Sequence, residues 1–172
     1  GRLRGTLDVG ALEQAFTRLV ERHETLRSVF IQQADERLVQ ARALLDLSPM
    51  GAAAITTSGF PLDRARVAHL LGFSAPLQNS YGCIAAIDYL TATYSAVELV
   101  FLHLGRLIQD LQVWTAFEVG QLYVPNAFVQ ISSIMPQKRN PVPIEHLRHL
   151  ASQTAARAHA VVTIMHNTPF TD

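Results

Sequence analysis

Apolar residues recur at helical spacing over a long stretch in the middle of the chain. From Ile84 to Leu111 they follow one another in steps of three, four or seven residues, which is the period of a helix with one buried face. The pattern predicts a helix over Ala85–Trp114, roughly 45 Å long from the rise per residue of an α-helix. A helix of that length is typical of a bundle or of an oligomeric helical core.

A second helical stripe follows near the end of the sequence. Its positions alternate in steps of three and four: Ile144, Leu147, Ala151, Thr154, Ala158, Val161 and Met165. They predict a helix over Pro141–Met165, with Asn140 as its N-cap and Pro141 at its first position. So narrow a stripe is typical of the seam of a packed bundle. A shorter helix is predicted over Pro61–Leu71, ended by Gly72.

The first 40 residues have a different pattern. A short strand-like start near Gly5 precedes apolar residues at helical spacing over Leu12–Val20. Two short apolar runs, Val29–Ile31 and Leu38–Val39, then flank a polar turn and predict two strands. We therefore expect a strand–helix–strand–strand segment over residues 1–42 and a separate all-α, long-helix bundle over residues 43–172.

The composition is that of a globular protein. Apolar residues make up 49% of the 172 residues and charged residues 16%, so the chain has enough apolar side chains to form its own core. The formal net charge is zero. Neutrality argues against non-specific nucleic-acid binding, which needs a basic surface. It is compatible with a small anionic substrate, because local groups bind such a molecule.

The single cysteine and the charge pattern limit the cellular setting. Cys83 is alone, so an internal disulfide and a cysteine-type metal site are not expected, and a reducing cytoplasm fits. No apolar run follows Arg2 and Arg4, so we expect no signal peptide. Charged residues interrupt the long apolar helix at Asp88, Glu98, Arg106 and Asp110. We expect a buried helix of a soluble protein there, not a membrane span.

The segment SSIMPQKRNP, from Ser132 to Pro141, gathers residues suited to chemistry. It carries two hydroxyl groups and two cations before a predicted helix, whose free N–H groups and dipole favour an anion. A serine near Lys138 could act as a general base, and Lys138 could hold a carboxylate or a developing negative charge. From the residues alone, ordinary capping of the following helix is the simpler explanation.

The same segment resembles the signature GSSxMPxKxNP of the argininosuccinate lyase/fumarase/aspartase superfamily, at every specified position from Ser132 to Pro141. Flanking strings agree in the same order: SPMG from Ser48, FPLDR from Phe60, LLGF from Leu70, NS from Asn79 and HLGRL from His103. The similarity covers about Ala43–Asp172. Gln137 indicates the argininosuccinate lyase branch, in which MPQK is usual.

This resemblance implies a fold and an activity. The fold is the superfamily's long-helix bundle, assembled as a cytoplasmic homotetramer without a cofactor, a metal or a nucleic-acid or membrane partner. The activity is β-elimination of a C–N bond from a small anionic substrate, an argininosuccinate-like N-substituted aspartate. The reaction releases fumarate and belongs to arginine biosynthesis.

The resemblance also implies roles for individual residues. Ser132 removes the proton next to a carboxylate, Lys138 stabilises the resulting enolate-like dianion, and Glu145 pairs with a catalytic histidine. The residues assigned to substrate binding are Ser133, Met135, Gln137 and Asn140. The loop that carries them closes over the substrate and excludes water.

Two departures from the family pattern bear on these roles. Ile131 stands where the family has a glycine, and a β-branched residue resists positive φ, which predicts a stiffer loop or a different N-substituted aspartate as substrate. The family's Thr-His and Ser-x-Asn segments have no counterpart in these residues. His146 and His149 lie one helical turn apart, but without a third ligand a solvated or packed role is expected.

The head of the chain has a second resemblance. Residues Leu7–Phe16 and Leu19–Phe30 look like the opening of a nonribosomal peptide synthetase condensation domain, without its double-histidine motif. The two resemblances together predict a fusion, a recombined gene or part of a longer protein. Two alternatives to a lyase therefore stand: a catalytically inactive helical assembly protein, and an interaction fragment derived from a condensation domain.

Overall fold

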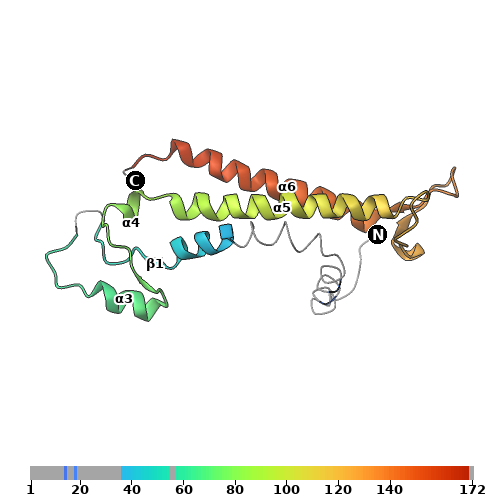
Figure 1. The fold of residues 1–172 in the computed structure, drawn as a ribbon. Helices are drawn as coiled ribbons and strands as arrows, with labels where there is room; N and C mark the ends of the chain where they lie inside the picture. The colour runs from blue at the N-terminus through green and yellow to red at the C-terminus, as the bar shows by residue number, and fades with distance from the viewer. Residues whose placement is uncertain (1–13, 15–17, 19–35, 55–56, 171–172) are drawn as a thin grey trace. The chain divides into compact units, whose positions relative to one another are not determined.

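The computed structural model describes residues 14, 18, 36–54 and 57–170 (Figure 1). Two compact units divide the chain, Gly1–Glu36 and Arg37–Asp172. The predicted strands near Gly5 and over Val29–Ile31, and the helix over Leu12–Val20 apart from its residues 14 and 18, lie outside the described residues. The resemblance of residues 1–42 to the start of a condensation domain therefore stays a prediction.

The predicted strand at Leu38–Val39 is wrong. Residues 37–45 are helical, and within them Ala41 is buried while Val39 is 66% exposed. A two-residue apolar run does not distinguish strand from helix, and the arginine, alanine and leucine residues that surround it favour a helix. This helix runs through residue 42, where the sequence placed the boundary between segments.

Two long antiparallel helices form the body of the second unit. They are α5 (Asp88–Trp114) and α6 (Val142–Ile164), and they lie side by side along most of their length (Figure 1). Both were predicted, with small differences at their first residues. Helix α5 begins three residues late because Ala86 is extended, at φ −72° and ψ 128°, and separates it from the short α4 (Gly82–Ala85). The 3-10 turn η2 (Met165–Asn167) follows α6.

Small side chains line the seam between these two helices. The residues of α5 and α6 that are buried are Ala96, Ile108, Ile144, Ala151, Ala155 and Ala158. Alanines allow the helix axes to approach closely, and each buried isoleucine contributes about 1.5–3 kcal/mol relative to exposure. Of the predicted stripe, Leu147 is 45% exposed and so lies outside the seam, while Ala155 takes a buried position that was not predicted.

The far end of the helix pair is closed by a compact corner. The two-residue strands β1 (Leu47–Ser48) and β2 (Ala75–Pro76) pair in parallel, and helix α3 (Arg64–Leu71) lies between them in sequence. As predicted, Gly72 ends α3, in a left-handed conformation with φ +83°. The carboxylate of Asp63 caps α3 by accepting the Arg66 N–H at 2.9 Å.

At the other end, an irregular connection joins α5 to α6. It contains the 3-10 turn η1 (Asn126–Phe128) and the strand β3 (Val129–Gln130), which pairs antiparallel with β4 (Asn140–Pro141). The predicted cap is wrong, because Asn140 pairs with Gln130 in this ladder and its side chain caps nothing. Helix α6 begins only at Val142, with Pro143 in its first turn.

Helix α5 has an unusual surface for a helix in a small unit. Together with α4 it is long and apolar enough to cross a membrane, judged by length and composition alone. Within the described part of the chain, only Ala96 and Ile108 of α5 are buried, and Leu102 and Val113 are about half exposed. The predicted helix is confirmed, but this chain by itself does not provide the burial expected for it.

Candidate functional site

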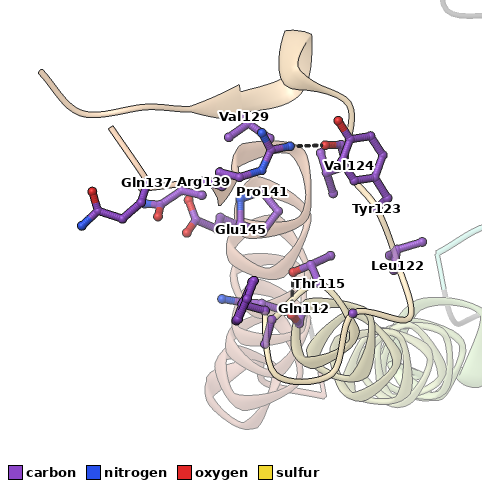
Figure 2. A pocket seen from close by; sticks show the side chains of 14 residues that line it. Gln112, Thr115, Leu122, Tyr123, Val124, Val129, Gln137, Arg139, Pro141 and Glu145 are labelled. Atoms are coloured by element: carbon purple, nitrogen blue, oxygen red, sulfur yellow. Dashed lines mark hydrogen bonds between the residues drawn. The ribbon is translucent and has the colours of Figure 1, made fainter. Parts of the chain in front are cut away.

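An open cavity of about 960 Å³ lies where α5 ends and α6 begins (Figure 2). Its walls come from the last turn of α5, the connection after it, the arm of the signature loop that leads into β4, and the first turn of α6. The charged and amide side chains that line it are Gln112, Gln137, Arg139, Asn140 and Glu145. The cavity therefore combines an apolar wall with a few polar groups, as small-molecule sites do.

The structure brings three of the seven predicted site residues to this cavity, namely Gln137, Asn140 and Glu145. Ser132, Ser133, Met135 and Lys138 belong to the same loop but do not line the cavity. Met135 is 46% exposed, and the neighbouring Ile134 is 88% exposed. The outer part of the loop thus projects into solvent, while its returning arm forms the wall.

Ser132 has an environment that its sequence position did not reveal. Its Oγ accepts hydrogen bonds from the backbone N–H groups of Ile134, at 3.2 Å, and Met135, at 3.3 Å. Two donors on one hydroxyl oxygen favour its ionised form over its neutral form. The turn continues with the Lys138 N–H donating to the Met135 carbonyl at 3.0 Å. The loop is thus a folded turn that the Ser132 side chain helps to hold.

Ile131 fits its position without strain. Among the described residues, the non-glycine residues with positive φ are Ala53, Ala54 and Thr57, and Ile131 is not one of them. The glycine that the family signature has here is therefore not required by the backbone conformation of this chain.

Arg139 is the residue whose role the sequence reasoning missed. Its guanidinium donates to the Val124 carbonyl at 2.9 Å and to the Asn126 amide oxygen, and it lies 5.4 Å from the centre of the Tyr123 ring (Figure 2). The sequence showed a second cation in the loop but gave no sign of these partners. They lie 13 to 16 positions earlier in an irregular connection, where no periodicity predicts contacts.

Glu145 and Lys138 are half-buried and carry the charges assigned to the site. Glu145 stands in the first turn of α6, where the helix dipole favours a negative charge. Within the described residues, no ion pair or hydrogen bond of its carboxylate is present, so the histidine partner implied by the family resemblance is not found there. The pairing stays a prediction.

Two of the three histidines of α6, His149 and His159, have side-chain partners. The His159 Nδ1 lies 3.3 Å from the carboxylate of Glu98 on α5, and His149 shares a hydrogen bond with Gln153 at 2.8 Å. His146 is exposed. Across residues 36–54 and 57–170, no group of three or more His, Cys, Asp or Glu side chains is arranged to hold a metal ion.

Cys83 contributes to the corner around α3. Its Sγ accepts from the Arg64 guanidinium at 3.4 Å and donates to the Asn79 carbonyl at 3.3 Å. The thiol is half-buried and has no place in the candidate site.

Comparison with known proteins places the chain in a family. A family model described as "Lyase" matches residues 25–155. Argininosuccinate lyase 2 of Agrobacterium fabrum is 78% identical over 137 residues, which are 80% of this chain and 27% of that protein. Argininosuccinate lyase of Thermus thermophilus is 43% identical over 117 residues, 68% of this chain and 25% of that protein. The chain thus spans about a quarter of the length of these relatives.

Solved structures of lyases superpose on this chain as well. An EDDS lyase in complex with formate superposes with a TM-score of 0.74 at 29% identity, over 86% of this chain and 30% of that one. A variant of EDDS lyase with bound fumarate gives a TM-score of 0.73 at 29% identity, over the same shares of both chains. With the family match covering most of the sequence, this chain belongs to the argininosuccinate lyase/fumarase/aspartase superfamily.

Proposed function

We propose that this chain forms part of a lyase that cleaves the C–N bond of an argininosuccinate-like N-substituted aspartate by β-elimination, releasing fumarate. The observation that carries the proposal is the signature loop, folded onto the end of a helix pair within a region 78% identical to an argininosuccinate lyase. The fumarate bound to an EDDS lyase variant of similar fold supports this product.

In this proposal Ser132 is the general base. It takes the proton from the carbon next to a substrate carboxylate, the C–N bond on the neighbouring carbon breaks, and a carbon–carbon double bond forms. The leaving nitrogen receives a proton from a general acid, and we place this role on a histidine of a family segment that has no counterpart in these residues. Support for Ser132 comes from the two backbone N–H groups that donate to its Oγ, because they stabilise the oxyanion that must exist before proton abstraction.

Lys138 has the electrostatic role. Removing a proton next to a carboxylate creates an enolate-like dianion, and a fixed cation lowers the free energy of that charge as it develops. Lys138 lies six residues after the base, on the same turn that closes through the Met135 carbonyl. Its half-buried position reduces solvent screening of the cation.

The remaining predicted residues bind the substrate or orient the acid. Gln137 and Asn140 line the cavity, where their amides provide donors for a carboxylate. Ser133 and Met135 stand on the exposed outer turn of the loop and contact the substrate when the loop closes. Glu145, also on the cavity wall, orients a histidine that the rest of the enzyme supplies.

We also infer that the chain acts in a cytoplasmic homotetramer and that the enzyme takes part in arginine biosynthesis. The exposed apolar side chains of α5 and α6, including Leu102, Val113, Leu147 and Leu150, support association. Such faces are costly in water and are covered when helices of several subunits pack together. The same association would bury α5 without a membrane.

The proposal is tested with the 172-residue chain and with a chimera. In the chimera, the matching region of this chain replaces its counterpart in the Agrobacterium fabrum relative, so that all other family segments are present. Release of fumarate from argininosuccinate, followed by ultraviolet absorbance, is the measurement. We expect an active chimera and a chain that is weak or inactive alone. A folded, oligomeric chimera without activity would instead support the inactive assembly protein.

A further inference from the structure

We propose that Arg139 is a positioning residue for the reaction, acting through an anchor formed by Tyr123, Val124 and Asn126. The inference rests on the proposed function, because it explains how Lys138 and Asn140 are held for their work. Arg139 stands between these two residues in the sequence, while its side chain reaches back to the connection after α5 (Figure 2).

The anchor uses three different contacts of one guanidinium group. Nη2 donates to the Val124 carbonyl at 2.9 Å, Nη1 donates to the Asn126 Oδ1, and the group lies over the Tyr123 ring at 5.4 Å. The Tyr123 hydroxyl also donates to the Asn126 Oδ1 at 3.4 Å. The connection therefore presents a carbonyl, an amide and a ring face that match a planar, fork-shaped cation.

The partners of Arg139 are all uncharged. A carbonyl and an amide satisfy its hydrogen bonds without cancelling its charge, and no ion pair to Arg139 occurs among the described residues. The guanidinium thus keeps its positive charge on the cavity wall. A lysine would carry the same charge but could not make two divergent hydrogen bonds and stack at once.

The neighbouring contacts show what the anchor controls. Asn140 is fixed by the β3–β4 ladder, in which it pairs with Gln130. On the other side of Arg139, the loop over residues 131–137 has its outer apolar side chains in solvent, with Ile131 70% and Ile134 88% exposed. Arg139 therefore holds the chain, through its side chain, just after the exposed turn ends. Without it, the backbone between Lys138 and Asn140 would lose its main restraint outside the ladder.

The consequence is a loss of catalytic rate with little loss of folding. A reacting group displaced by about 1 Å costs on the order of 100-fold in rate. We therefore expect Arg139→Ala in the chimera to lower kcat about 10- to 100-fold, with KM little changed and the melting temperature preserved. Arg139→Lys should recover only a small part of the loss, because it restores the charge and not the fork.

A double-mutant cycle and a matched control sharpen this test. Tyr123→Ala should lower kcat by itself, and the double variant Tyr123→Ala with Arg139→Ala should lose less than the product of the two single losses. Arg157→Ala removes the same side chain from an exposed position in the middle of α6 and should keep the parental kcat. Full recovery of kcat by Arg139→Lys would show that charge alone matters and would overturn the proposal.

A second measurement does not depend on activity. In the 172-residue chain, Arg139→Ala should increase amide hydrogen exchange over residues 131–138, while Arg157→Ala should not. If the chimera is inactive but exchange responds in this way, the proposed function fails and the anchor stands. If the chimera is active and Arg139→Ala leaves both kcat and exchange unchanged, the anchor fails and the proposed function stands.

Discussion

Two arginines form similar contacts in two different parts of the molecule, one in the corner around α3 and one beside the cavity. Arg64, at the corner near α4, donates to the Leu77 carbonyl at 2.7 Å, to the Met50 carbonyl at 3.2 Å and to the Cys83 thiol. Arg139, at the opposite end, holds the connection after α5 in a similar way. Both use one guanidinium to join segments that are distant in sequence.

The surroundings of the two arginines separate their roles. Arg64 is half-buried, and a Cβ added to Gly51 would lie only 3.0 Å from the Arg64 Cγ. The Arg64 side chain is therefore packed tightly into the corner. Arg139 is exposed beside an open cavity, between Lys138, which is assigned to catalysis, and Asn140, which is assigned to substrate binding. We therefore expect the contacts of Arg64 to serve stability, because the segments that they join are packed together, and those of Arg139 to serve function, because the loop beside it carries the proposed reactive groups.

The largest effect is expected at the site itself. Ser132→Ala in the active chimera should reduce turnover by at least about 10²–10³-fold, because it removes the proposed base. Substrate affinity should stay close to that of the parent, since the cavity residues are untouched. Turnover is measured by fumarate release, and affinity by binding of a substrate analogue. Undiminished turnover in the Ser132 variant would move the role of base to Ser133, which Ser133→Ala would then test.

The next effect falls on the closed corner. Arg64→Ala should lower the free energy of unfolding by about 1–3 kcal/mol, because two backbone carbonyls lose a charged donor. Arg66→Ala, two residues later and exposed on the same helix, should change it by less than about 0.5 kcal/mol. Urea unfolding of both variants gives the comparison. Equal stability of the two variants would contradict the role given to Arg64.

The smallest effect concerns the turn that ends α3. Gly72→Ala should lower the free energy of unfolding by about 1 kcal/mol, because Gly72 holds φ at +83°, which an alanine adopts only with strain. No neighbouring atom would obstruct the added methyl group, so the backbone strain is the whole expected effect. Gly59→Ala is the matched control, since that glycine also has open space but no positive φ. Thermal unfolding should show a lower melting temperature for the first variant and an unchanged or higher one for the second.

The spacing of apolar positions was enough to predict both long helices, because steps of three and four residues fit the period of a helix, even though few of those positions are buried in this chain. It also predicted where α3 ends, since Gly72 is the only local residue that adopts the required left-handed conformation without cost. The signature string over Ser132–Pro141 was enough to indicate the loop and its family. Local rules sufficed in these places because the interactions involved lie within one or two helical turns.

Tertiary contacts decided the rest. Asn140 is a residue type that favours the N-cap position, but its pairing with Gln130 outweighs that local preference, and α6 begins only at Val142. The strand expected at Leu38–Val39 is helical, because two residues carry too little periodicity to choose. The arginine anchor depends on an irregular connection whose course no spacing rule describes. The sequence by itself therefore determined the two long helices and the family signature of the loop, while only the fold determined which side chains hold that loop in place.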